Sequence, residues 1–218
     1  NWYDWGCAHC SEGNYAIIMN GPRGWSGPEY AQGWSFNVPT AEFYNSFEDG
    51  DSRRDATVLD IEAFASATGA SYTEGYDHTG YFNNKYIPRA GESGGQTELN
   101  YLTNFRIIRY SDVLLMAAEA YNRGGIDDGL AQEFLNQVRR RAFGDDNHDI
   151  SASGTALTDA IWEERKFELS LEGHRFFDLV RTGRASALIP GFTEGKHEVF
   201  PIPQQEVDIS GLTQNAGY

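Results

Sequence analysis

The chain has 218 residues, enough to bury a sizeable hydrophobic core as one domain or as one domain and part of another. Its 32 acidic and 17 basic residues give a net charge of -15, which argues against nucleic acid or an anionic membrane surface as a direct partner because like charges repel. No apolar run approaches the roughly 18 residues that cross a bilayer, so the sequence predicts no transmembrane helix.

The two cysteines of the chain, Cys7 and Cys10, lie close together near its start. Haem attachment would need His directly after the second cysteine, where Ser11 stands, and zinc would need two more ligands while only His9 is near. A local disulfide or two free thiols is the favoured interpretation of this C-x-x-C spacing, and metal binding is the minor alternative.

Residues 1–104 are rich in Gly, Asn, Ser and aromatic residues and show no sustained helical period. They predict an irregular region of loops with short strands. One helix is expected in the segment TAEFYNSF, where Thr40 is a suitable N-cap and Phe43 and Phe47 stand four residues apart.

An acidic stretch follows that helix. Its carboxylates lack the alternating spacing and closing Glu of a calcium loop. We therefore favour a turn in which two arginines balance the negative charges of the acids. The acids are Asp49, Asp51, Asp55 and Asp60, and the bases are Arg53 and Arg54.

Aromatic side chains set among Gly, Asn, Ser and Pro are the most informative feature of residues 1–104. Flat rings with a polar edge suit sugars, whose C–H faces stack on them while polar side chains bond the hydroxyls. For any single ring, packing in the protein's own interior is the default. The candidate glycan-stacking residues are Trp25 and Trp34, then Trp2 and Trp5, with Tyr30 and Tyr76.

Residues 105–218 change in character and become helical. Apolar residues spaced by three and four predict a helix hairpin over 106–143, broken at the segment NRGG and restarted at Asp127 and Asp128. Small residues with Tyr121 and a short turn resemble a tetratricopeptide unit, and such units need about three neighbours for stability. The acidic loop after the hairpin reads as solvated surface, although Asp145, Asp146, His148 and Asp149 are cation ligand types.

A charged helix is predicted over residues 155–182. Its charged and apolar residues share one face, so the charges are expected to be partly buried and to pair as a structural network. Gly173 inside this helix predicts close approach of another backbone. The predicted network consists of Arg165, Glu168, Glu172, Arg175 and Asp178.

Paired carboxylates also raise a hydrolytic alternative, since glycoside hydrolysis uses two of them. Catalytic carboxyls face each other across a substrate, whereas Glu164, Glu168 and Glu172 follow one another on a single helix with arginines between them. An ion-pair ladder is therefore favoured over an active site. No nucleophile elbow, phosphate loop or metal motif is present in the sequence, and residues 196–218 predict an extended tail.

Several strings in this order resemble the SusD/RagB family of nutrient-binding lipoproteins of the Bacteroidetes outer membrane. The resemblance runs from about Ser11 to the last residue and is most specific in the charged helix. It is carried by FEDGDSRRDATVL at 47–59, RIIRYSDVLLMAAEAYNRGG at 106–125, EERKFELSLEGHRFFDLVRTG at 163–183, FPIPQQEVD at 200–208 and the terminal QNAGY.

The resemblance implies a mainly α fold in which tetratricopeptide-like helix hairpins are capped by a long irregular region with short strands. It further implies a cell-surface protein that binds an oligosaccharide or polysaccharide and delivers it to a TonB-dependent transporter of the SusC type. Family members are longer and begin with a signal sequence and a lipidated cysteine, so the chain is interpreted as the C-terminal portion, with the remaining N-terminal part as a partner. The outer membrane's extracellular face is the implied location.

The alternatives are a helical-repeat module that binds proteins without glycan and, less favoured, a glycoside hydrolase. No cofactor or metal is expected, and calcium stays open without a motif to support it. We therefore predict residues 1–104 to form the ligand-binding cap and residues 105–218 the helical C-terminal region, in a protein that binds and does not catalyse.

Overall fold

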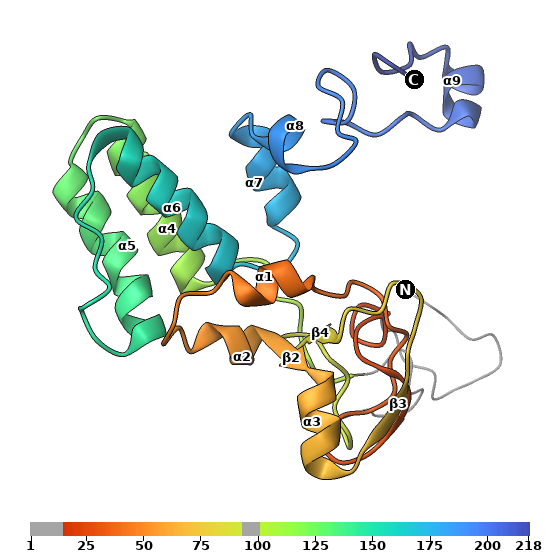
Figure 1. Cartoon of the computed structure of the whole chain (residues 1–218). Coiled ribbons are helices and arrows are strands. Elements are labelled where there is room, and N and C mark those ends of the chain that lie inside the picture. Colours follow the sequence, from red (N-terminus) through yellow and green to blue (C-terminus); the bar gives the residue numbers. More distant parts are fainter. Residues whose placement is uncertain (1–14, 93–100) are drawn as a thin grey trace. The chain divides into compact units, whose positions relative to one another are not determined.

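The computed structural model describes residues 15–92 and 101–218. The chain divides into two compact units, Asn1–Glu172 and Gly173–Tyr218. Within the first unit, Figure 1 shows three longer helices, α4 to α6, beside a region of short helices and strands that is coloured red to yellow.

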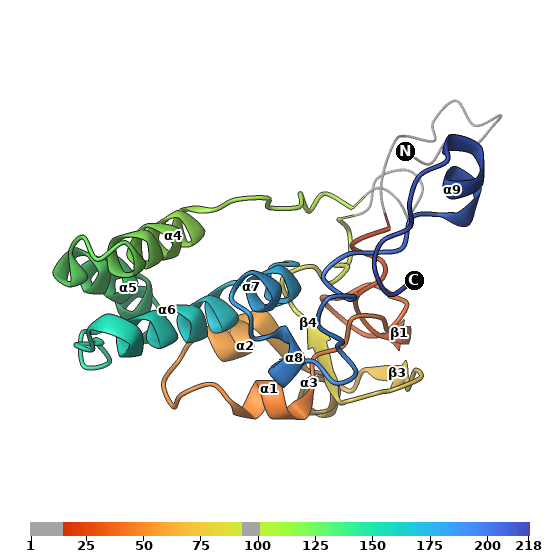
Figure 2. The same cartoon turned by 90° about the horizontal axis from the view of Figure 1, so that it is seen from above.

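Two small antiparallel sheets hold the irregular region of the first unit together. The first pairs β1 with β3 and contains an irregularity in register, while the second pairs β2 with β4 and places Val58 opposite Asn83. Figure 2 labels β1 and β3 of the first pair, and β4 of the second. The strands are β1 (Arg23–Ser26), β2 (Val58–Asp60), β3 (Ser71–Thr73) and β4 (Tyr81–Asn83).

Three short helices, α1 (Ala41–Asn45), α2 (Arg53–Thr57) and α3 (Ile61–Thr68), connect these strands. The hydroxyl of Thr40 accepts a hydrogen bond from the Phe43 amide, so α1 lies where its N-cap places it. The carboxylate of Asp60 caps α3 in the same way, and left-handed Gly69 ends it. The sequence predicted only the first of the three.

The irregular region has its own hydrophobic core. The buried residues come from the loop before α1 and from both strands of the second sheet, so the sheet and α3 close over one apolar centre. They are Tyr30, Leu59, Ile61, Phe82 and Ile87.

The helices α4 (Tyr110–Arg123), α5 (Asp128–Phe143) and α6 (Gly154–Glu168) form the second part of the first unit. Asp127 caps α5 by accepting from the Leu130 amide at 3.0 Å, and α5 ends at left-handed Gly144. The antiparallel hairpin of α4 and α5 thus lies within the range that apolar spacing indicates.

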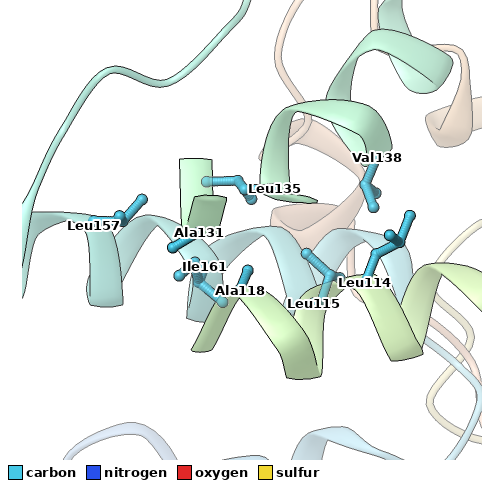
Figure 3. Close-up of a cluster of buried hydrophobic side chains, with 8 residues drawn as sticks. All are labelled: Leu114, Leu115, Ala118, Ala131, Leu135, Val138, Leu157 and Ile161. Atoms are coloured by element: carbon cyan, nitrogen blue, oxygen red, sulfur yellow. The ribbon is translucent and has the colours of Figure 1, made fainter. Parts of the chain in front are cut away.

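All three helices contribute to one continuous core, shown in Figure 3. Its members repeat at the three- and four-residue spacing of a buried helix face, which is why α6 closes against the hairpin. They are Leu114, Leu115, Ala118, Ala131, Leu135, Val138, Leu157 and Ile161. The predicted fold class, helix hairpins with a long irregular region and short strands, is confirmed.

The single charged helix predicted for residues 155–182 is wrong. α6 ends at Glu168, and the next helix, α7 (Arg175–Arg181), begins after a turn. Leu171 and Gly173 in that turn have φ of 63° and 86°, and a left-handed residue cannot continue a right-handed helix. A Cβ at Gly173 would meet nothing within 4 Å, so this glycine serves the backbone conformation and not the close approach that was expected.

The second unit contains α7, α8 (Ala185–Leu188) and α9 (Gln204–Ser210). The tail from 196 to 218 is therefore not wholly extended as predicted. Pro203 biases its predecessor away from helix but itself suits a helix start, so α9 begins directly after it. None of the helices within the described residues is long and apolar enough to cross a membrane.

Candidate functional site

A ladder of four backbone hydrogen bonds joins residues 33–36 to residues 18–22. The amides of Gly33, Trp34, Ser35 and Phe36 donate to the carbonyls of Pro22, Ile18, Gly21 and Met19 at 2.8 to 2.9 Å. Gly33 makes this approach possible, since a Cβ on it would lie 1.9 Å from the Asn20 carbonyl oxygen. The ladder fixes the backbone from which two neighbouring aromatic side chains project.

Trp34, Phe36 and Tyr76 form what we call the aromatic loop surface. The backbone before Tyr76 lies close to the backbone between Trp34 and Phe36. A Cβ on Gly75 would lie only 2.8 Å from the Ser35 Cβ. Tyr76 is 92% exposed and Phe36 47%, while Trp34 is half-buried. Aromatic rings held at the surface by a fixed backbone are available to stack on a ligand.

The Arg23 side chain contacts two residues of this surface, Trp34 and Phe36. Its Nε donates to the Trp34 carbonyl at 2.6 Å, and its guanidinium lies 5.5 Å from the centre of the Phe36 ring. Trp34 also packs on Tyr15, with ring centres 5.2 Å apart. Polar contacts and stacking therefore position the Trp34 and Phe36 side chains.

Three of the left-handed residues that are not glycine surround the aromatic loop surface. Ser35, Asn37 and Asp77 have φ between 53° and 57°. Such conformations cost on the order of 1 kcal/mol or more and concentrate at functional sites, where the surrounding structure enforces them. Ser35 shows this enforcement, because its hydroxyl accepts from the Arg23 amide at 3.1 Å.

The other predicted stacking residues are placed differently. Tyr30 is 5% exposed within the core of the irregular region, and the half-buried Trp25 packs 6.0 Å from both Tyr30 and Phe64 between ring centres. Both pack with Phe64, and neither is a member of the aromatic loop surface. Trp2 and Trp5 lie outside the described residues, as do Cys7 and Cys10. Phe36 and Arg23 were not predicted, although Phe36 stands two residues from Trp34.

A second cluster surrounds the C-terminal end of α6. Glu168, 2% exposed, accepts hydrogen bonds from Arg53 and Arg109 and from Arg141 at 2.6 Å. Glu172 accepts from Arg109 at 2.8 Å and from Lys85 at 2.6 Å. Arg53 lies in α2 and Arg141 in α5, while Lys85 follows β4 and Arg109 precedes α4. Two carboxylates therefore join four segments of the chain.

Glu164 extends the cluster to the other side of α6. It accepts from Arg53 at 2.5 Å and from Arg139 at 2.8 Å, and Arg53 also binds Asp51 at 2.6 Å. The carboxylates of Glu164, Glu168 and Glu172 are thus all occupied by arginine or lysine donors, which is the arrangement of a structural network and not of two acids facing a substrate. We call the whole set the carboxylate network.

Acid is expected to destabilise the first unit through Glu168. Burial alone would raise the pKa of its carboxyl, but the hydrogen bond and charge of Arg109 and the charge of Arg141 hold this pKa at about 2, against an ordinary 4.5. A lowered folded pKa stabilises the protein above pH 4.5, and that stabilisation, about 3 kcal/mol, is lost as the pH falls from 4.5 towards 2.

The thermal midpoint of wild type should therefore fall across this pH window more steeply than that of Glu168→Gln, which has no carboxyl to protonate there. Parallel pH profiles of the two proteins would contradict the assignment of this stabilisation to Glu168.

Glu168 and Glu172 of the predicted network bind cations from other segments, namely Arg53, Lys85, Arg109 and Arg141. Arg165 binds Asp112 of α4 at 2.8 Å. Asp178 and Arg175 lie in the second unit, where Asp178 binds Arg181 at 2.7 Å.

The acidic loops form ion pairs and hydrogen bonds with nearby arginines. Arg54 pairs with Asp55 at 3.1 Å, and Arg140 binds Asp149 at 2.5 Å. The His148 carbonyl accepts from Arg139 at 2.6 Å. Among residues 15–92 and 101–218, no group of three His, Cys, Asp or Glu side chains is placed to hold a metal ion.

The sequence model of the SusD family matches residues 57–218, which include α3 to α9, the second unit, and the carboxylate network except Asp51 and Arg53. The chain belongs to the SusD family. This family assignment agrees with the resemblance found in the sequence strings.

Solved SusD-like structures have the same fold. A laminarin-binding SusD-like protein is 42% identical, with a TM-score of 0.82 over 94% of this chain and 44% of that one. Surface glycan-binding protein A from Bacteroides thetaiotaomicron, solved in complex with laminarihexaose, is 33% identical, with a TM-score of 0.83 over 97% of this chain and 48% of that one.

A curated relative, SusD-like protein P2 of Formosa agariphila, is 30% identical over 94% of this chain and 45% of its own length. The chain therefore spans about half the length of these SusD family relatives.

Proposed function

We propose that this SusD-family chain is the part of a cell-surface protein that captures a glycan by stacking sugar rings on the aromatic loop surface. The observation that carries the proposal is a set of aromatic side chains exposed on a backbone that a hydrogen-bond ladder and three left-handed residues hold in place. Preorganised rings bind sugars without the entropic cost of ordering a loop.

Laminarin is the first candidate ligand. Two similar structures support this choice, one of a laminarin-binding protein and one in complex with laminarihexaose. Binding in this proposal uses stacking and hydrogen bonds alone, needs no cofactor and involves no hydrolysis. Arg23, Asn37 and Asp77 border the rings and are suited to bond sugar hydroxyls.

We further propose the family's arrangement at the outer membrane, in which a lipid-anchored binding protein delivers its glycan to a SusC-like TonB-dependent transporter. The exposed face of α4 supports contact with a further part of the same protein. Val113 and Met116 are each 44% exposed on this helix, and apolar side chains grouped in this way mark interfaces.

Titration calorimetry with laminarihexaose tests the glycan proposal. Tyr76→Ala and Trp34→Ala should each weaken binding by about tenfold, because stacking of a sugar on one ring is worth roughly 1 kcal/mol or more. Tyr76→Phe keeps the ring and should bind nearly as wild type. Tyr76 is 92% exposed, so its replacement should leave the thermal midpoint unchanged.

Tyr110→Ala is the matched control, since Tyr110 is 71% exposed at the start of α4 and is not a member of the aromatic loop surface. Equal affinity of wild type, Tyr76→Ala and Trp34→Ala would contradict the assignment of the site. Heat from slow turnover would instead support the hydrolase alternative.

A further inference from the structure

A cavity of about 730 Å³ lies beside the carboxylate network, apart from the three rings of the aromatic loop surface. Its lining comes from α2, from the residues after β4, from the segment before α4 and from the ends of α5 and α6. In a chain of net charge -15, six cationic side chains face this one space against three carboxylates. The cations are Arg53, Lys85, Arg89, Arg106, Arg109 and Arg141.

The carboxylates at the floor of the cavity have little capacity left for more cations. Both oxygens of Glu168 accept from Arg141 at 2.6 Å, and Arg53 and Arg109 add further bonds. Both oxygens of Glu172 accept from Arg109, and one also accepts from Lys85. A carboxylate has about four acceptor sites, so these two are nearly saturated.

Donors, in contrast, remain available at the rim. The exposed guanidinium of Arg106 lies 5.6 Å from the centre of the Tyr86 ring and has no hydrogen-bond acceptor among the described residues. Arg141 uses only Nη2 for Glu168, so within the described part of the chain its Nε and Nη1 are unoccupied, and its side chain is 58% exposed. A guanidinium carries five N–H donors and is never deprotonated in proteins.

From this surplus of fixed donors over acceptors we infer that the cavity binds the carboxylate of a small acidic sugar, with Arg106 and Arg141 as its main contacts. Arginine presents two parallel N–H groups that match a carboxylate in geometry as well as charge. The neutral side chain of Thr103 also lines the cavity and can bond a ring hydroxyl. A cavity of this size exceeds what an inorganic anion fills and lies within the range of small-ligand sites.

The charge of the whole protein restricts the ligand further. A long polyanion would meet the repulsion of a surface with net charge -15, whereas one acidic sugar meets only the local cations. We therefore assign the site to a single uronic acid, free or as the end residue of a short oligosaccharide. This site is independent of the proposed stacking of glycan on Trp34, Phe36 and Tyr76.

Calorimetric titration with sodium glucuronate, with glucose and with sodium sulfate at matched ionic strength tests the inference. Glucuronate should bind at least about tenfold more tightly than either of the others, and added sodium chloride should weaken it. Arg106→Gln should reduce glucuronate affinity by about tenfold, the loss expected for one charge-assisted hydrogen bond, and Arg106→Lys by less. Among the described residues the Arg106 side chain would lose only its contact with the Tyr86 ring, so Arg106→Gln should change the thermal midpoint little.

Arg123→Gln is the control, because this arginine is 50% exposed on α4 and pairs only with Glu119 and the ring of Trp162 among the contacts seen. Equal binding of glucose and glucuronate, equal binding of sulfate, or unchanged affinity in Arg106→Gln would each overturn the inference. Binding by the 218-residue chain but not by the longest natural form of the protein would also overturn it, in favour of a polypeptide segment that covers the cavity. Laminarihexaose binding should be the same in Arg106→Gln as in wild type, so failure of one proposal is distinguishable from failure of the other.

Discussion

Replacing Glu168 by alanine is expected to destabilise the first unit by about 3 to 5 kcal/mol, which is the usual cost of removing one partner from a buried ion pair. The carboxylate is 2% exposed and binds Arg53, Arg109 and Arg141. Arg53 is itself 7% exposed, so Glu168→Ala leaves its charge buried with one acceptor fewer. Since a typical domain is stable by only about 5 to 15 kcal/mol, much of the native state would be lost at ambient temperature.

Urea unfolding followed by circular dichroism measures this effect. Glu168→Gln keeps the size of the side chain but not its charge and should also destabilise, whereas Glu163→Ala on the same helix should cost less than about 1 kcal/mol. Glu163 has a side chain that is 45% exposed and pairs with Lys166. If Glu168→Ala unfolded at the same urea concentration as Glu163→Ala, the carboxylate network would not have the stabilising role assigned to it.

Gly33→Ala is the second change with a large expected effect. The added Cβ would lie 1.9 Å from the Asn20 carbonyl oxygen and 2.6 Å from that of Gly21, and both obstacles are backbone atoms that a rotamer change cannot move. Overpacking of this kind costs typically 1 to 3 kcal/mol and sometimes more. The two segments must separate, so the ladder from Gly33 to Phe36 weakens and the rings of Trp34 and Phe36 lose their fixed positions.

The expected result is a lower thermal midpoint together with loss of laminarihexaose binding, measured by calorimetry. Gly129→Ala tests whether alanine is harmful in general. Gly129 lies in the first turn of α5, where a Cβ meets only the Asp127 side chain at 3.2 Å and alanine is the better helix former. A Gly33→Ala protein that binds glycan as wild type would show that the ladder does not position the rings.

Helix starts and stops were readable from the sequence where a local cap produces them. Thr40, Asp127 and the glycines after α4 and α5 act within a few residues, so their signals are visible without any knowledge of the fold. The helix α3 carries the same signals, with Asp60 before it and Gly69 after it, and could have been predicted on those grounds. The turn after Glu168 was missed because Leu171 adopts a left-handed conformation, which the identity of that residue does not suggest.

For the candidate sites, apolar and charged spacing predicted which side chains are buried but not which residues they contact. The three-and-four spacing indicated that Glu168 is buried with a charge to neutralise, but spacing on one helix cannot name the partners on other segments. Arg53, Lys85 and Arg109 come from positions 59 to 115 residues away in sequence. Trp25 and Trp34 likewise look alike among polar neighbours, and both are half-buried in the fold. Trp25 packs on Tyr30 and Phe64 whereas Trp34 packs on Tyr15, and the sequence names none of these partners.

The position of the carboxylate network along the chain has a consequence for the order of folding. Arg53 meets Glu164 across 111 residues and Glu168 across 115, and Lys85 meets Glu172 across 87. During synthesis, the irregular region therefore emerges before its cations can bind the carboxylates at the end of α6, and Arg53 then has only the nearby Asp51 as a partner. The irregular region is expected to reach its final packing in one late step, after that end of α6 has formed.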